Sequence, residues 1–198
     1  YTSPEVDEDT MPTAVRLVRA DAHMKRGALD VAEPLLEEAA AYYSESGDNA
    51  DKAQALRQLA ELRMDSGRWD DALGLIEHAA EIGANGEKIE LGRIEMMHGA
   101  VLRRLRRFEE ARAAYDRSLA LFRSVDAGIE SAIVMNSLAV LARDEDRPED
   151  AERLYRESIE TRLAIDPRPN PSIAISLSNL GRLLTSLGRY EEARETLE

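Results

Sequence analysis

The sequence predicts an all-α solenoid of about five antiparallel helix hairpins. Three observations predict it: an alanine recurs about every 40 residues, a small residue precedes most of these alanines at a fixed distance, and large apolar residues flank both at helical spacing. A fixed period of about 20–50 residues is typical of repeat proteins, in which each unit is one supersecondary element that stacks on its neighbours.

The recurrent alanine marks the second helix of each hairpin. Its copies are Ala32, Ala72, Ala111, Ala151 and Ala193, at intervals of 40, 39, 40 and 42 positions. Bulky residues stand three positions before and four positions after each copy, as Trp69 and Ile76 do in the second unit. This spacing places all three residues on one side of a helix. Glycines five positions before three of the alanines predict the turns within the hairpins.

A second small residue marks the first helix of each hairpin. It stands twelve positions before four of the alanines, at Ala60, Gly99, Ala139 and Gly181. Paired small residues on two consecutive helices let the helix axes approach closely, which a tightly packed antiparallel hairpin requires.

The helices follow in order from these patterns. The expected pairs are 11–26 with 29–45, 49–66 with 69–83, 87–105 with 108–124, 127–144 with 148–165, and 171–187 with 190–198. Pro148 and Pro171 suit the first turns of their helices, because proline lacks an N–H that would be unpaired there in any case. The segment DPRPNP (166–171) reads as a loop, and the acidic residues 1–10 read as a flexible lead-in.

The expected domain organisation is one repeat array over residues 11–198. Its units span about 11–48, 49–86, 87–126, 127–168 and 169–198. The last helix is about half the length of its counterparts, so the fifth unit is expected to be truncated. Because a solenoid must cover its last apolar face, the chain is expected to be part of a longer array or to pair there with another copy.

Composition excludes several classes of function. The net charge is -13 and aromatic residues make up 5% of the chain, so neither nucleic acid nor a membrane is an expected partner. The absence of cysteine excludes thiolate metal sites and cysteine nucleophiles.

No apolar run could span a bilayer, and the acidic start does not resemble a signal peptide, so we expect a cytoplasmic protein. Only three lysines accompany many arginines, which suggests a bacterial source.

The candidate chemical sites are weak, and no catalytic, metal or cofactor site is expected. His23, His78 and His98 do not share a metal-ligand motif, and the chain has no nucleophile or phosphate-loop motif. The acidic cluster at 144–150 lacks the glycine and the terminal glutamate of a calcium loop. The acidic pairs at 70–71, 109–110, 149–150 and 191–192 recur with the repeat, which predicts favourable interactions with the helix dipole.

The segment LSNLGRLLTSLGRYEEARETL (177–197) resembles the tetratricopeptide repeat, a unit of two helices with small residues at its eighth and twentieth positions. The longer stretch YRESIETRLAIDPRPNPSIAISLSNLG (155–181) is similar to the roughly 42-residue units of kinesin light chains and bacterial regulatory proteins. The resemblance covers the chain from about Met11 onward. It implies a right-handed superhelix that serves as a non-catalytic scaffold for protein interactions.

The resemblance also implies where a partner would bind. In this family the first helix of each unit lines a concave groove, and inward positions can be assigned by register. Asn179 stands where the family commonly holds the backbone of a bound peptide, and Asn136 lies one position earlier. Amides and guanidinium groups suit peptide backbone and carboxylates, and methionines accept varied side chains. The candidate partner-binding residues are Arg57, Glu61, Arg93, Met96, Met97, Arg103, Asn136, Arg143, Asn179 and Arg182.

A basic segment interrupts the acidic chain and has two interpretations. Residues 92–124 contain eight arginines and four acidic residues. Either these arginines pair with carboxylates of neighbouring units, or they form a docking patch for an acidic segment of a partner. Two alternatives to peptide binding also stay open: a homodimer through the C-terminal unit, and a ligand-sensing segment of a larger bacterial protein.

Overall fold

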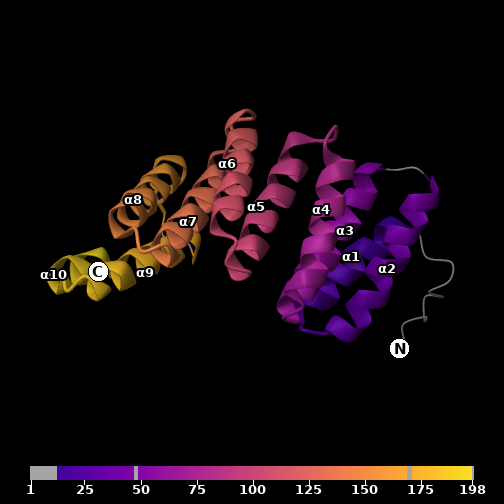
Figure 1. The fold of residues 1–198 in the computed structure, drawn as a ribbon, viewed down its shortest axis with the longest axis horizontal. Coiled ribbons are helices and arrows are strands. Elements are labelled where there is room, and N and C mark those ends of the chain that lie inside the picture. The colour runs from indigo at the N-terminus through magenta and orange to yellow at the C-terminus, as the bar shows by residue number, and fades with distance from the viewer. Residues whose placement is uncertain (1–12, 47–48, 169–170, 198) are drawn as a thin grey trace. The chain divides into compact units, whose positions relative to one another are not determined.

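The computed structural model describes residues 13–46, 49–168 and 171–197. Within these residues the secondary structure consists of ten α-helices, and no strand occurs (Figure 1). The expected lead-in at residues 1–10 lies outside the described residues. The predicted all-α class is confirmed.

The helices pair as the repeat predicts, and their bounds agree with the expected ones to within two residues. The first helices of the five hairpins are α1 (Thr13–Lys25), α3 (Asn49–Asp65), α5 (Lys88–Arg104), α7 (Gly128–Asp144) and α9 (Pro171–Ser186). The second helices are α2 (Leu29–Ser46), α4 (Trp69–Gly83), α6 (Phe108–Arg123), α8 (Pro148–Ile165) and α10 (Tyr190–Leu197).

The chain divides into two compact units, with the boundary between Glu90 and Leu91. In the first unit, α1 packs on α2, α2 on α3, and α3 on α4. In the second unit, packing runs in the same sequential way from α6 to α10. Helix α5 starts just before the boundary and lies mostly in the second unit.

The small residues lie where the two helices of a hairpin approach most closely. Ala32, Ala72, Ala111 and Ala151 are fully buried, and Ala193 is nearly so. A methyl group added at Gly99 would come within 2.7 Å of the Tyr115 ring. The small side chains are therefore required by the distance between the helices, as the sequence pattern indicates.

The turns within the hairpins share one backbone conformation. Gly27, Gly67 and Gly188 have φ values of 73° to 75°. Arg106 and Asp146 stand at the equivalent positions of the third and fourth hairpins, also five residues before the recurrent alanine, with φ values of 61° and 58°. The left-handed turn is thus common to all five hairpins, although only three of them provide the glycine that favours it.

Candidate functional site

The predicted residues of the second unit lie on α5, α7 and α9. We call this set the first-helix face: Arg93, Met96, Met97, Arg103, Asn136, Arg143, Asn179 and Arg182. The structure brings several of these residues together in two groups. One group consists of amides and the other of guanidinium groups.

The amide group joins α7 to α9. The side-chain oxygen of Asn136 accepts a hydrogen bond from Asn179 Nδ2 at 3.3 Å and another from Ser176 Oγ at 3.2 Å. Both asparagines are half-buried, whereas Ser176 is fully buried. The orientation of the Asn136 amide is therefore fixed by α9.

Buried polar side chains of helix α8 form hydrogen bonds next to this amide pair. The buried guanidinium of Arg162 donates to Ser176 Oγ at 3.3 Å, and Ser158 donates to the backbone oxygen of Ala132 at 2.7 Å. Burial lowers the pKa of Arg162. Polar side chains that are buried and hydrogen-bonded in this way hold their partners in one arrangement.

The arginine group is centred on Arg103 and Arg143, which lie at the C-terminal ends of α5 and α7. Asp144 accepts from Arg103 at 2.5 Å through one carboxylate oxygen and from Arg143 at 3.1 Å through the other. Arg182, on α9, is exposed and forms no ion pair with any described residue. Two arginines from two first helices, Arg103 and Arg143, thus share a single carboxylate.

Two tyrosines at equivalent repeat positions, Tyr115 and Tyr155, lie near these arginines. Burial raises the pKa of Tyr115 to about 12, against the influence of a hydrogen bond from Arg103. Tyr155 stands 40 positions later and is also fully buried, but within the described structure its hydroxyl has no hydrogen-bond partner. Burial raises the pKa of Tyr155, and the charges that act on it are those of Arg143, Asp144, Arg182 and Arg103.

The predicted residues of the first unit have a different environment. Arg57 forms an ion pair with Glu90 at 2.5 Å and a longer one with Glu61 at 3.9 Å. Burial raises the pKa of Glu61, and Asp65 and Asp21 add to this effect while Arg57 opposes it. Arg57 is therefore neutralised within its own unit, and it does not join either group on the first-helix face.

The remaining predicted residues lie on α5. Met96 and Met97 are partly exposed, which leaves part of each side chain available for contact. Arg93 is exposed and is engaged in an interaction with another residue. These three residues join no hydrogen-bonded group described above.

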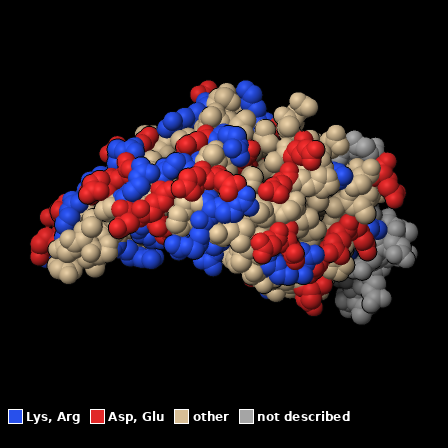
Figure 2. Space-filling model, in the orientation of Figure 1, with Lys and Arg blue, Asp and Glu red and all other residues tan. Residues whose placement is uncertain are grey.

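The arginines of residues 92–124 are used mainly within the protein. Arg103, Arg112 and Arg123 pair with Asp144, Glu145 and Glu157 of the following hairpin, and Arg107 and Arg117 pair with Glu110 and Glu95. The remaining three, Arg93, Arg104 and Arg106, also have interactions. On the part of the second unit seen in Figure 2, basic and acidic side chains alternate. The ion-pair interpretation therefore fits this segment better than a continuous docking patch.

Sequence reasoning missed one recurrent residue. An arginine stands four positions before the recurrent alanine at Arg68, Arg107, Arg147 and Arg189. Arg189 contacts Glu152 at 2.6 Å and Glu192 at 2.5 Å. In the acidic pairs at 109–110, 149–150 and 191–192, one acid thus also pairs with this arginine. The recurrence of arginine at one repeat position was the signal that could have found them.

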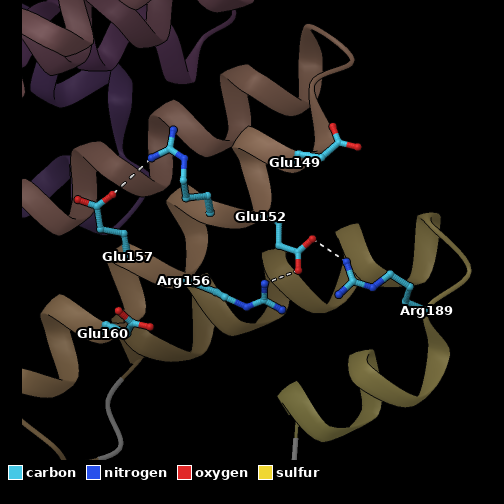
Figure 3. A pocket seen from close by; sticks show the side chains of 7 residues that line it. Glu149, Glu152, Arg156, Glu157, Glu160 and Arg189 are labelled. Carbon is cyan, nitrogen blue, oxygen red and sulfur yellow. Dashed lines mark hydrogen bonds and ion pairs between the residues drawn. The ribbon is translucent and has the colours of Figure 1, made fainter.

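Glu152 lies in a depression of about 580 Å³ along α8, lined by charged side chains of both signs. Figure 3 shows Glu152 between Arg156 and Arg189, and Glu149 and Glu160 farther away at the edges. The central carboxylate is already paired with two guanidinium groups. This depression is therefore an ion-pair network that links α8 to the turn before α10.

No group of three or more metal-ligating side chains occurs in the described residues. In the same residues, no helix combines the length and the apolar character needed to cross a membrane.

The fold and the repeat register define a helical-repeat protein made of two-helix units. One tetratricopeptide repeat model matches residues 17–87 and 136–198, and a second matches residues 90–164. The chain therefore belongs to the tetratricopeptide repeat family, whose members typically are non-catalytic scaffolds that bind proteins or peptides. No curated protein matches the sequence significantly.

Solved structures with the same fold include BtubC (BKLC) from P. vanneervenii. It has 25% sequence identity and a TM-score of 0.80, with 92% of this chain and 75% of BtubC covered. Nearly identical TPR-like repeats of a Podosopora anserina protein described as a kinesin light chain have 18% identity and a TM-score of 0.75, covering 95% and 93%. The apo form of RapI has 13% identity and a TM-score of 0.80, covering 94% and 68%.

Proposed function

We propose that this chain is a protein-interaction module that binds an extended segment of a partner on the first-helix face of the second unit. The family supports the general class of function. The observation that carries the proposal is the hydrogen-bonded pair of Asn136 and Asn179.

The pair suits a peptide backbone because it presents both a donor and an acceptor. The oxygen of Asn136 and one N–H of Asn179 are used between the two residues. The amide N–H groups of Asn136 and the oxygen of Asn179 are not used in this contact. A peptide unit also carries one donor and one acceptor, so it can bond to both amides at once.

Two further features of the first-helix face support the same assignment. Met96 and Met97 are flexible and partly exposed, so they can accept apolar side chains of different shapes. The buried contacts of Ser176 with α8 hold Asn136 in place before binding, which lowers the entropy cost of forming a complex.

Phage display of random 12-residue peptides on the immobilised chain tests this proposal. Enriched peptides would then be measured by fluorescence polarisation against the wild type and Asn179→Ala. We expect Asn179→Ala to weaken binding about tenfold, because it removes hydrogen bonds to the peptide backbone. Asn85→Ala is the matched control, since it removes an exposed amide in the turn after α4. Lack of enrichment, or equal affinity for Asn179→Ala, would contradict the proposal.

A second candidate function is self-association through the C-terminal hairpin. Leu187, Tyr190 and Leu197 are 43%, 67% and 59% exposed, although Leu197 also packs against Gly181. Large apolar side chains gathered on one hairpin favour a protein contact. Light scattering over a range of concentrations would detect a dimer, and Tyr190→Glu should abolish it. A monomer at every concentration would exclude this candidate.

A further inference from the structure

Three arginines of the first-helix face, Arg103, Arg143 and Arg182, carry more positive charge than Asp144 neutralises. Arg103, Arg143 and Arg182 contribute three positive charges and Asp144 one negative charge, and all four charges lie near enough to act on the Tyr155 hydroxyl. Arg103 is held by the shorter ion pair and by its hydrogen bond to Tyr115. Arg143 has the longer contact to Asp144, and Arg182 forms no ion pair within the described structure. Arg143 and Arg182 are therefore the two cations available to a ligand.

The polar network beside these cations is also incomplete. In the third hairpin, the Tyr115 hydroxyl is bonded to Arg103. In the fourth hairpin, the equivalent Tyr155 hydroxyl has no partner among the described residues, and Arg143 bonds to Asp144. A buried polar group without a hydrogen bond is costly, so such groups are uncommon in folded proteins. One hydrogen-bonding position in this group is thus unused in the free protein.

We propose that Arg143 and Arg182, with the Tyr155 hydroxyl beside them, form a subsite for a dianionic phosphoryl group on the partner segment. The proposal rests on the proposed function, because it names the chemistry of the segment that would occupy the same face. It assigns Arg182 the role of an exposed first contact. It assigns Arg143 the role of a second contact that exchanges Asp144 for the ligand.

Charge favours a phosphoryl group over a carboxylate. The three arginines and Asp144 together have a net charge of about +2. A phosphorylated side chain carries about −1.5 to −2 at pH 7. A carboxylate would neutralise only half of the excess. Guanidinium groups also bind the oxygens of phosphate in a bidentate way, so two of them can hold three terminal oxygens.

Ligand binding would also complete the network around Tyr155. When Arg143 turns to the phosphoryl group, one oxygen of Asp144 loses its donor. Burial keeps the Tyr155 hydroxyl protonated, so it can donate to Asp144 or to a ligand oxygen. A hydrogen bond that the free protein lacks then forms in the complex.

The first experiment isolates the subsite from peptide binding. Phenyl phosphate would be titrated into ¹⁵N-labelled protein while the arginine Nε–Hε signals are followed by NMR. We expect saturable shifts for Arg143 and Arg182, and about tenfold weaker binding in Arg182→Gln. Arg182 forms no ion pair, so this variant should fold normally. Arg153→Gln is the matched control because it removes the same charge from α8, where Arg153 is 62% exposed.

Two outcomes of this titration would overturn the proposal. One is equal binding of phenyl phosphate by the wild type and Arg182→Gln. The other is binding of benzoate as tightly as phenyl phosphate, which would indicate a carboxylate site. Tyr155→Phe gives a further check: it should weaken phenyl phosphate binding while leaving the free protein at least as stable, because the hydroxyl has no partner there.

The second experiment separates this proposal from the proposed function. Peptides enriched on the chain would be compared with versions carrying serine, phosphoserine or glutamate at each position. A gain of about tenfold for phosphoserine at one position, lost in Arg182→Gln, supports the subsite. Peptides that depend on Asn179 but gain nothing from phosphoserine would leave the proposed function in place and overturn the subsite. Phenyl phosphate binding through Arg182 without any peptide binding would support the subsite alone.

Discussion

Arg189 connects the turn before α10 to Glu152 of the preceding hairpin, with 2.6 Å between Nη1 and the carboxylate oxygen. Arg68 and Glu33 occupy the same repeat positions in the first unit and are 3.0 Å apart. In the second and third repeats, the position of the glutamate is held by Leu73 and Arg112. The link between hairpins is thus present where the chain provides an acid one residue after the recurrent alanine.

The link between Arg189 and Glu152 should be cooperative. We expect Arg189→Gln and Glu152→Gln each to lower the melting temperature, and the double variant to lower it by less than their sum. The reason is that Glu152 is largely shielded from solvent, with its side chain 12% exposed. Thermal unfolding of the four proteins checks the coupling. Arg194 and Glu191 form an exposed pair within α10, and the same cycle there should show additive effects.

Gly99 should not tolerate a larger side chain. Gly99→Ala would place a methyl group 2.7 Å from the Tyr115 ring, so it is expected to reduce the free energy of unfolding by about 1–3 kcal/mol. Gly74→Ala is the matched control in α4, where nothing lies within 4 Å of the added methyl. It should increase stability by about 0.5–1 kcal/mol, because alanine favours a helix over glycine. Urea unfolding of both variants provides the measurement. Equal destabilisation would contradict the packing argument.

Asp146 should be replaceable by glycine with a gain in stability. Its φ of 58° is unfavourable for a residue with a side chain and is adopted by glycine at the same turn in three other hairpins. We expect Asp146→Gly to raise the free energy of unfolding by about 0.5–1 kcal/mol. Gly67→Ala should have the opposite sign, because it introduces a side chain at a φ of 73°. A loss of stability in Asp146→Gly would show that the turn conformation is not strained.

Glu61 and Glu95 should respond to pH in opposite directions. Burial raises the pKa of Glu61, so its ionised form weakens the fold. We expect Glu61→Gln to stabilise the protein at pH 7, with a gain that shrinks as the pH falls through the raised pKa. Urea unfolding between pH 4 and pH 7 measures it, and a gain that does not depend on pH would contradict the assignment.

Glu95 is the control of opposite sign. Burial acts to raise its pKa, but His98, whose Nδ1 lies 3.7 Å from the Glu95 carboxylate, and hydrogen bonds from Arg117 outweigh burial, so the pKa of Glu95 is lowered. Its carboxylate therefore stabilises the fold above the ordinary pKa of a glutamate, and that contribution is lost as the pH falls through the lowered value. Glu95→Gln should reduce stability at pH 7 and have less effect in acid.

The fold could be predicted from the sequence because it is determined mainly by a short residue pattern that recurs in every hairpin. The recurrent alanines and the small residues twelve positions earlier define both helices of a hairpin and the face on which they meet. Turns that lack glycine were harder to assign, because residue type does not mark them. Asp146 adopts the same conformation without being glycine. Register, rather than residue type, identifies that turn.

The candidate site could be predicted only in part. Repeat register brought Asn136 and Asn179 onto one face, where they form a hydrogen bond. It could not distinguish Arg57, which two carboxylates neutralise, from Arg182, which forms no ion pair in the described structure. That difference depends on which side chains of neighbouring helices are within reach, and a single sequence does not specify these distances.

The sequential packing of the helices has a consequence for how the protein unfolds. In the described structure, the packed helix pairs within each unit are adjacent in the chain or next but one. Contacts between near neighbours can form without closing long loops, so individual hairpins can open and close without global unfolding. Hydrogen exchange should therefore reveal several local opening reactions with different free energies, the lowest at the terminal hairpins.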